Sequence, residues 1–205
     1  MIAIIDYGVG NLFSLTASLK YLGIEAEVTS DAERVRRADK LILPGVGAFA
    51  DARAKLDATL LTPVIREEVF SGKPLLGICL GMQMLFDVSY EYGVHSGLGF
   101  VPGEVRSLTK DLDDIGVSLK VPEMGWNSLK ILKNDPILKY NSDGDYVYYV
   151  HSYYVPEAEH TLASSAYGVA VSGVVREGKV YGTQFHPEKS GSVGLKILRA
   201  FDELE

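Results

Sequence analysis

Apolar residues in the first half of the chain fall into short runs that alternate with helical stripes. Four of these runs have strand length: Ile2–Asp6, Ile24–Thr29, Lys40–Leu43 and Pro74–Ile78. After the first run, Asn11 can cap a helix whose leucines recur at helical spacing and which ends at Gly23. Further helices are predicted near Ala48–Ala58, Leu60–Ser71 and Leu80–Tyr90. Strands separated by helices predict an open, mainly parallel sheet with helices on both faces.

The second half of the chain changes to strand signals joined by turns. The predicted strands are Val101–Leu108, Trp126–Leu132, Tyr146–Tyr154, Val169–Arg176 and Lys179–Phe185. A closing helix is predicted over Ser190–Leu204. Because no repeat, low-complexity tract or linker interrupts the pattern, we expect residues 1–205 to form a single α/β domain in which an antiparallel β extension continues the parallel sheet.

Charge and composition exclude several classes of protein. The 205 residues include 20 Lys+Arg and 27 Asp+Glu, a net charge of −7, which argues against a nucleic-acid partner. No apolar stretch has the roughly 18 residues of a membrane span, and Met1–Tyr7 lacks the basic flank and cleavage site of a signal peptide. The single cysteine allows no internal disulfide and no Cys-rich zinc site. We therefore expect a cytoplasmic protein without metal or cofactor.

The single cysteine, Cys79, lies in the segment Gly77-Ile78-Cys79-Leu80-Gly81, between an apolar strand and a predicted helix. This is the pattern of a nucleophile elbow with Cys as the nucleophile. The N-terminus of the helix would stabilise a thiolate, and the backbone N–H of Leu80 would face a developing oxyanion. A packed core thiol is the alternative, and the elbow alone does not separate the two.

Two further motifs also follow predicted strands. In His186-Pro187-Glu188, Pro187 biases His186 toward an extended backbone, so Glu188 could share its side of the chain and orient the imidazole as a base. A surface histidine beside a solvated glutamate is the alternative. Pro44-Gly45-Val46-Gly47 stands where elbow enzymes take their second oxyanion donor, or it is a plain glycine turn. All three motifs are predicted at the carboxyl ends of strands, where open α/β sheets place their sites.

Together these motifs resemble the class I (triad-type) glutamine amidotransferases, in order and spacing across the whole chain. Four segments are similar to one branch of that family, the glutaminase subunits of imidazole glycerol phosphate synthase: Pro44-Gly45-Val46-Gly47, Met124-Gly125-Trp126-Asn127, Val150-His151-Ser152-Tyr153 and His186-Pro187-Glu188-Lys189-Ser190. The glutaminase of pyridoxal-phosphate synthase is similar in length. It typically shows a Gly-Gly-Glu-Ser loop and a Cys-Ala-Gly nucleophile, and this chain has neither.

The resemblance implies a flavodoxin-like fold that hydrolyses L-glutamine to glutamate and ammonia through a γ-glutamyl thioester. Cys79 would be the nucleophile, His186 would carry the proton and Glu188 would hold His186. The oxyanion hole would use Val46, Gly47 and Leu80, with Val46 facing the wrong way at rest. The substrate-binding residues would be Gly45, Gln83, Glu91, Ser152 and Tyr153. Gln83 and Glu91 are two i,i+4 steps apart, so both are predicted on one helix face, with a solvated face as the alternative.

The resemblance also implies a partner, a (β/α)8-barrel cyclase that forms a heterodimer with this chain and receives the ammonia. That cyclase makes imidazole glycerol phosphate and AICAR from the ribulosyl ribonucleotide PRFAR in histidine biosynthesis. The predicted docking residues are Met124, Trp126, Asn127, Tyr148 and Lys189. Five of the 12 tyrosines fall within Tyr146–Tyr154, which favours an interface because Tyr suits half-wet surfaces. Ordinary strand composition and core burial are the alternatives.

Other functions stay open at this stage. A nucleotide-binding module is suggested by Gly8-Val9-Gly10, although G-x-G-x-x-G would need glycine where Phe13 stands. A non-catalytic interaction protein with this fold is a second alternative, and the presence of Cys79, His186 and Glu188 counts against it. A cysteine hydrolase acting on another amide is a third.

Overall fold

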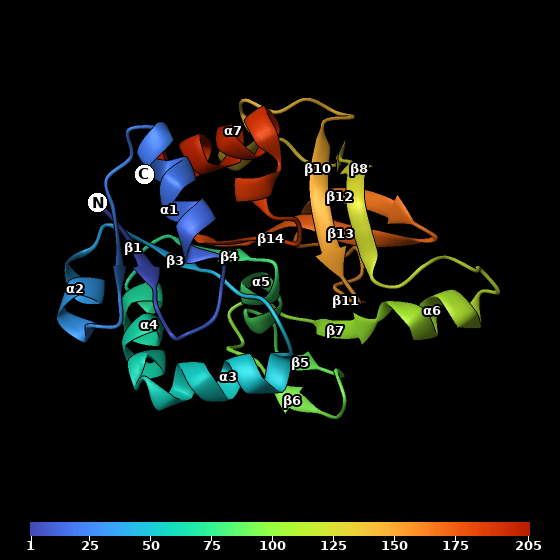
Figure 1. Ribbon diagram of the computed structural model, residues 1–205, viewed down its shortest axis with the longest axis horizontal. Coiled ribbons are helices and arrows are strands. Elements are labelled where there is room, and N and C mark those ends of the chain that lie inside the picture. The colour runs from blue at the N-terminus through green and yellow to red at the C-terminus, as the bar shows by residue number, and fades with distance from the viewer.

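Eight strands form the central sheet of the computed structural model, which describes residues 1–205 (Figure 1). Their order across the sheet is β2-β1-β3-β4-β14-β13-β12-β9. The first five are parallel to their neighbours and the last three are antiparallel, as the sequence predicts. Their bounds are β1 (Ile2–Ile5), β2 (Ala26–Thr29), β3 (Lys40–Leu43), β4 (Leu75–Ile78), β9 (Lys130–Ile131), β12 (Thr161–Tyr167), β13 (Val169–Glu177) and β14 (Val180–Thr183).

Two smaller sheets and the helices surround this central sheet. One small sheet pairs β8 (Glu123–Ser128) with β10 (Tyr146–His151). The other has the order β11-β7-β5-β6, with β5 (Val88–Ser89), β6 (His95–Ser96), β7 (Glu104–Ser107) and β11 (Tyr153–Tyr154). The α-helices are α1 (Leu12–Tyr21), α2 (Ala32–Arg37), α3 (Phe49–Ala58), α4 (Leu61–Phe70), α5 (Leu80–Met84), α6 (Leu108–Asp114) and α7 (Gly191–Asp202). Two 3-10 helices are η1 (Pro136–Leu138) and η2 (Pro187–Lys189).

The inner parallel strands β1, β3, β4 and β14 are buried on both faces, whereas the edge strand β2 is only partly buried, and alternate residues supply two separate cores. In β1, Ile2 and Ile4 belong to a cluster of 22 buried residues, whereas Ala3 and Ile5 belong to another of 27. Helices α1 and α7 cover the first face, and α3, α4 and α5 lie on the opposite side (Figure 1). This period of two explains why the strands appear in the sequence as nearly continuous apolar runs.

The helix that starts at Leu80 is shorter than the sequence predicts. It was expected to reach Tyr90, but α5 ends at Met84. The carbonyls of Met84, Leu85 and Phe86 accept N–H groups from residues 98–101 instead of from a further helical turn. Every residue from Leu80 to Phe86 is buried, so the helix has no polar face that would continue along the surface. Glu91 therefore does not lie on this helix.

Several strand predictions need correction in the second half. The run Tyr146–Tyr154 is divided at Ser152, because β10 pairs with β8 and β11 joins the other small sheet. The run Trp126–Leu132 is divided in the same way between β8 and β9. Strand β12 was missed because its middle holds serines rather than apolar residues. Both serines are buried, and Ser165 Oγ donates to the Ser128 carbonyl at 2.7 Å.

The sequence also gave no expectation for α2 and α6, which are 6 and 7 residues long. Each begins at a side-chain cap, with Asp31 accepting from Glu33 N–H and Ser107 accepting from Lys110 N–H. No helix of the structure has the length and apolar character needed to cross a membrane.

Candidate active site

Strands β3, β4 and β14 lie side by side in the centre of the sheet and run in the same direction. The register pairs Leu43 with Gly77 and Ile78 with Thr183, so the three strands end at the same level. The loop that begins at Pro44, the elbow at Cys79 and the segment that leads to His186 therefore meet at one edge. The three motifs predicted from the sequence form a single site.

Cys79 occupies a strained turn between β4 and α5. Its φ of 55° and ψ of −111° lie outside the regions that residues with side chains ordinarily adopt. The turn depends on Gly81, where an added Cβ would lie 1.9 Å from the Leu43 carbonyl oxygen. A Cβ at Gly77 would lie 2.7 Å from the Gly81 carbonyl oxygen. Both glycines thus allow the close backbone contacts that a nucleophile elbow requires.

The loop after β3 packs directly against this elbow. A Cβ on Gly45 would lie 2.5 Å from the backbone nitrogen of Gly81, so only glycine allows the contact. On the other side, Tyr7 Oη donates to the Pro44 carbonyl at 2.6 Å. The backbone N–H groups of Val46 and Gly47 donate to no other group of the protein. The loop therefore holds two unused donors beside Cys79.

His186 and Glu188 form a buried pair. His186 Nδ1 lies 2.8 Å from Glu188 Oε1, and the two side chains are only 2% and 3% exposed. His186 has the extended backbone that Pro187 favours, with φ −94° and ψ 101°. The chain then enters the 3-10 helix η2 instead of remaining extended as predicted, and this turn brings the carboxylate to the imidazole. Ser190 Oγ donates to the His186 carbonyl at 2.7 Å and fixes the turn.

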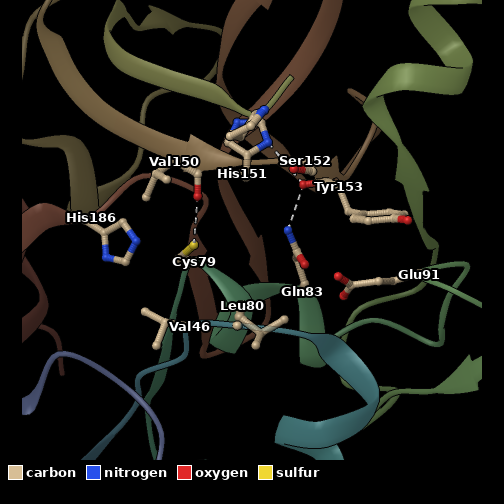
Figure 2. A pocket seen from close by; sticks show the side chains of 12 residues that line it. Val46, Cys79, Leu80, Gln83, Glu91, Val150, His151, Ser152, Tyr153 and His186 are labelled. Atoms are coloured by element: carbon tan, nitrogen blue, oxygen red, sulfur yellow. Dashed lines mark hydrogen bonds between the residues drawn. The ribbon is translucent and has the colours of Figure 1, made fainter. Parts of the chain in front are cut away.

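The surroundings of His186 favour its protonated form. Burial lowers the pKa of His186, but its interactions with Cys79 and Glu188 outweigh burial and raise that pKa to about 9. The Nε2 atom is buried and makes no hydrogen bond, and the ring faces the Cys79 sulfur (Figure 2). The arrangement of Cys79, His186 and Glu188 is the one that a nucleophile, a base and an orienting carboxylate require.

These residues open into a cavity of about 270 Å³ (Figure 2). Nine of the residues predicted for the site line it: Val46, Gly47, Cys79, Leu80, Gln83, Glu91, Ser152, Tyr153 and His186. Gly45 is not among the lining residues, because it lies beneath the loop against Gly81. Glu188 lies behind His186. Three lining residues were not predicted, namely Pro122, Val150 and His151.

Gln83 is a buried residue of α5, and both N–H bonds of its side-chain amide donate to acceptors within the protein. The nitrogen donates to the Tyr153 carbonyl at 2.8 Å (Figure 2). It also donates to Gln184 Oε1 at 3.0 Å. Its Oε1 accepts no hydrogen bond from the protein, so it is the atom available to a ligand.

Glu91 reaches the same cavity from the turn between β5 and β6, not from a helix face shared with Gln83. The predicted i,i+4 relation was therefore wrong, although both residues line one cavity. Glu91 Oε2 accepts the N–H of Phe49 at the start of α3, at 2.7 Å. Burial raises the pKa of Glu91, against the opposing effects of this N–H and of His95. Its carboxylate is thus positioned by α3 and faces the cavity (Figure 2).

Gln184 and His151 are polar residues of the site that the sequence reasoning missed. Gln184 Nε2 lies 3.8 Å from Cys79 Sγ. Strand alternation could have found it, since Gln184 stands two residues before His186. His151 Nδ1 is 3.1 Å from the Tyr153 carbonyl oxygen, and its Nε2 is 3.0 Å from buried Glu123. No sequence pattern connects Glu123 with His151, because they meet only across the pairing of β8 with β10.

The predicted docking residues lie mainly on the β8–β10 sheet. Met124 and Trp126 are 63% and 55% exposed, and Trp126 pairs with Tyr148 across the sheet with ring centroids 6.0 Å apart. Lys189 is exposed on η2. Asn127 differs, because its amide donates to Glu123 Oε1 and to the Ala166 carbonyl within the chain. Met124 pairs with Val150, which lines the cavity, so this face adjoins the site.

The glycine segment after β1 supports the site instead of forming a separate one. A Cβ at Gly10 would lie 2.9 Å from the Pro44 side chain, so Gly8-Val9-Gly10 packs against the loop that follows β3. Asn11 caps α1 by accepting the Ser14 N–H. No group of three or more His, Cys, Asp or Glu side chains is arranged to hold a metal ion.

The fold and this site define a class of enzyme, and comparison with known proteins agrees. The family model for class-I glutamine amidotransferases matches residues 3–203. The chain therefore belongs to the class-I glutamine amidotransferase family, as its motifs predict. A crystal structure of a glutamine amidotransferase has a TM-score of 0.74 at 21% identity, covering 98% of this chain and 97% of that one. PurLQS from Thermotoga maritima has a TM-score of 0.72 at 19% identity, covering 98% and 96%. Both confirm the predicted fold class.

Sequence relatives narrow the family to one branch. The imidazole glycerol phosphate synthase subunit HisH of Listeria monocytogenes (strain EGD-e) is 46% identical over 206 residues, covering 100% of this chain and 96% of the relative. The subunit HisH of Bacillus cereus (strain G9842) is 50% identical over 202 residues, covering 98% and 93%. That of Caldanaerobacter subterraneus subsp. tengcongensis is 48% identical over 206 residues, covering 100% and 98%. The predicted resemblance to this branch is confirmed.

Proposed function

We propose that this chain is the glutaminase subunit of imidazole glycerol phosphate synthase and hydrolyses L-glutamine to glutamate and ammonia. The observation that carries the proposal is the strained elbow that presents Cys79 to the buried His186–Glu188 pair inside a cavity lined by polar groups.

The arrangement supports acyl transfer in two steps. His186 accepts the thiol proton, and Cys79 Sγ attacks the side-chain amide carbon of glutamine to give a tetrahedral oxyanion. His186 then gives that proton to the leaving nitrogen, so ammonia departs and a γ-glutamyl thioester remains. Water attacks the thioester, and its proton passes through His186 to the departing sulfur, which releases glutamate. A raised pKa suits His186 to hold the proton between these transfers.

The oxyanion would be held by backbone N–H groups of Leu80 and of the Val46–Gly47 segment. The Gly45–Gly81 contact fixes the base of this segment against the elbow, whereas Gly47 has a φ of 89°, a conformation that glycine adopts freely. A peptide beside such a glycine is free to change orientation. We assign the gating of catalysis to this loop, with Val46 turned into the productive orientation when the partner binds its own ligand.

The cavity also offers groups for the amino-acid end of the substrate. Glu91 would pair with the α-ammonium group, since its carboxylate faces the cavity. Gln83 Oε1 would accept an N–H of the ligand, and Ser152 and Tyr153 would complete the pocket from the segment between β10 and β11.

The partner would be a (β/α)8-barrel cyclase docked on Met124, Trp126 and Tyr148. Aromatic residues and Met are enriched at the centres of protein interfaces. The adjoining Val150 lines the cavity, so ammonia would be released next to the covered face. There the cyclase would use it to form imidazole glycerol phosphate and AICAR for histidine biosynthesis. A cytoplasmic location suits this function, because Cys79 must remain a free thiol.

The proposal is tested by measuring glutamate release from glutamine by the purified chain alone, with a candidate cyclase, and with the cyclase and its ribonucleotide ligand. We expect little release by the chain alone and a rise of about 10²-fold or more in the liganded complex, the effect of completing an oxyanion hole. Full turnover by the chain alone would overturn the gating. No glutamate release under any condition would overturn the glutaminase function.

A further inference from the structure

Gln184 lies behind the cavity wall, in contact with Gln83 and Cys79, and has no part in the triad. It follows β14, is fully buried and has its backbone N–H bound to the Gly173 carbonyl at 2.9 Å. Its side chain lies between two polar partners. Oε1 is 3.0 Å from Gln83 Nε2, and Nε2 is 3.8 Å from Cys79 Sγ. A buried amide in this position has no access to water, so both ends depend on these partners.

The hydrogen-bond network determines which end of the amide faces the sulfur. The Tyr153 carbonyl oxygen only accepts hydrogen bonds, so the Gln83 atom 2.8 Å from it must be the nitrogen. That same nitrogen lies 3.0 Å from the Gln184 side chain, which must therefore present its oxygen there. The NH2 group of Gln184 is left facing Cys79. The Tyr153 carbonyl thus orients the Gln83 amide, and the Gln83 amide in turn orients the NH2 group of Gln184 toward Cys79.

Apart from the imidazole of His186, which interacts with Cys79, the sulfur has few other sources of stabilisation. The sequence assigned this role to the N-terminus of a helix reaching Tyr90, but α5 has only 5 residues and aligns fewer peptide dipoles. The Val150 carbonyl, 3.9 Å from Sγ, accepts a hydrogen bond from a thiol and repels a thiolate (Figure 2). A hydrogen bond donated by the side-chain N–H of Gln184 therefore favours the thiolate form of Cys79 over the thiol.

We propose that Gln184 is a catalytic residue that donates an N–H to the Cys79 thiolate, and that Gln83 positions its amide. The inference rests on the proposed function, in which Cys79 attacks as a thiolate after its proton has passed to His186. Gln83 then has two roles. Its Oε1 meets the substrate, and its Nε2 orients the amide of Gln184 that donates to Cys79.

The test uses the full chain and the pH dependence of Cys79 alkylation by iodoacetamide, which reads the thiolate without glutamine turnover. Cys79 is the single cysteine, so all alkylation reports on this site. Gln184→Glu keeps the volume and the acceptor for Gln83 but replaces the donor with a carboxylate. Gln184→Met removes both hydrogen bonds and adds no charge. The control is Thr183→Val, a nearly isosteric change at a buried neighbour whose hydroxyl has no partner.

We expect the midpoint of the alkylation profile to move up by about one to two pH units in Gln184→Met, the size of a hydrogen bond to a charged group. The shift should be larger in Gln184→Glu and absent in Thr183→Val, with unchanged circular dichroism as the check on folding. Wild-type midpoints in both Gln184 variants would overturn the inference. Failure of the wild-type complex to release glutamate would instead overturn the proposed function, so the two failures are distinguishable.

Discussion

The imidazole of His186 and the carboxylate of Glu188 lie 2.8 Å apart, on residues separated only by Pro187. Both side chains are almost fully buried, so the carboxylate acts on the imidazole with little screening by solvent. Since Glu188 does not line the cavity, it influences the substrate only through His186. The pair therefore sets the range of pH over which the site can hold the proton it transfers.

Glu188→Gln should shift the alkaline limit of the reaction to lower pH. Burial lowers the pKa of His186, while Cys79 and Glu188 raise it to about 9 from the ordinary 6.5. The ammonia-releasing step needs the imidazolium, so activity in the wild type should be lost as pH rises through about 9. Without the Glu188 charge the pKa of His186 falls, and the limit falls with it. The measurement is kcat/KM against pH in the cyclase complex.

The matched control for Glu188→Gln is Glu177→Gln, which removes an exposed carboxylate at the end of β13. Its alkaline limit should coincide with that of the wild type. An unmoved limit in Glu188→Gln would contradict the role given to this carboxylate.

Glu91→Gln should raise KM for glutamine by about ten- to a hundredfold, the loss expected for a charged hydrogen bond, with a smaller effect on kcat. The amide oxygen retains the acceptor for Phe49 N–H, so the loop geometry is kept while the charge opposite the α-ammonium group is lost. A rise in KM with little change in kcat is expected when the lost interaction stabilised the bound substrate and the transition state equally. Asp51→Asn, an exposed carboxylate on α3, is the control. A fall in kcat at constant KM would place Glu91 outside the ammonium site.

The presence and the parallel direction of the first four strands could be predicted from the sequence, because they alternate with helices and most of their residues are buried. In the run Lys40–Leu43 every residue after Lys40 is apolar and buried, and the bounds of the run agree with β3. The triad could be predicted for a related reason, since the elbow glycines and Pro187 restrict the local backbone whatever surrounds them. Strands β4 and β14 are parallel neighbours, so their carboxyl ends lie side by side. This brings Cys79, which follows β4, close to His186 and Glu188, which follow β14.

The remaining parts of the site depend on contacts between distant segments. Helix α5 ends where N–H groups of residues 98–101 bind the carbonyls that a further helical turn would use. The helix propensities of the local residues do not predict this. Glu91 reaches the cavity because Phe49 N–H holds it, across 42 positions of the chain. Gln184 acquires its role only when Gln83 and Cys79 are brought to it. Long-range hydrogen bonds of this kind leave no periodic signal in the sequence.

Gly81→Ala should disrupt both stability and catalysis. A Cβ there would lie 1.9 Å from the Leu43 carbonyl oxygen, so the elbow or the end of β3 must move. We expect a loss of about 3 kcal/mol in the free energy of unfolding, at the upper end for overpacking, and a fall in kcat of about 10²-fold because the reacting atoms are displaced. Urea unfolding and the glutamate assay measure the two effects.

The control is Gly116→Ala, where φ is 69° and no atom lies near the added Cβ. It carries backbone strain of about 1 kcal/mol without a clash and should leave kcat unchanged. Equal losses of kcat in the two variants would contradict the importance of the close contact at the elbow.

Trp126→Ala should weaken binding of the cyclase by about thirtyfold, the effect of losing an interface hot spot of about 2 kcal/mol. Trp126 is exposed yet packed edge-on against Tyr148, so its position is fixed before binding. The dissociation constant is measured by titration calorimetry. Tyr21→Ala, an 80% exposed aromatic at the far end of α1, should bind as the wild type does. Equal dissociation constants for Trp126→Ala and the wild type would remove Trp126 from the interface.

The most direct test of the account compares two nitrogen sources in the complex of the cyclase with Cys79→Ala. Cys79 is the single cysteine of the chain, it lines the cavity, and it is the proposed nucleophile. We expect formation of imidazole glycerol phosphate from glutamine to fall by at least about 10³-fold, while formation from added ammonium salt matches that of the wild-type complex. Glutamine-dependent synthesis that survives in Cys79→Ala would contradict the central claim.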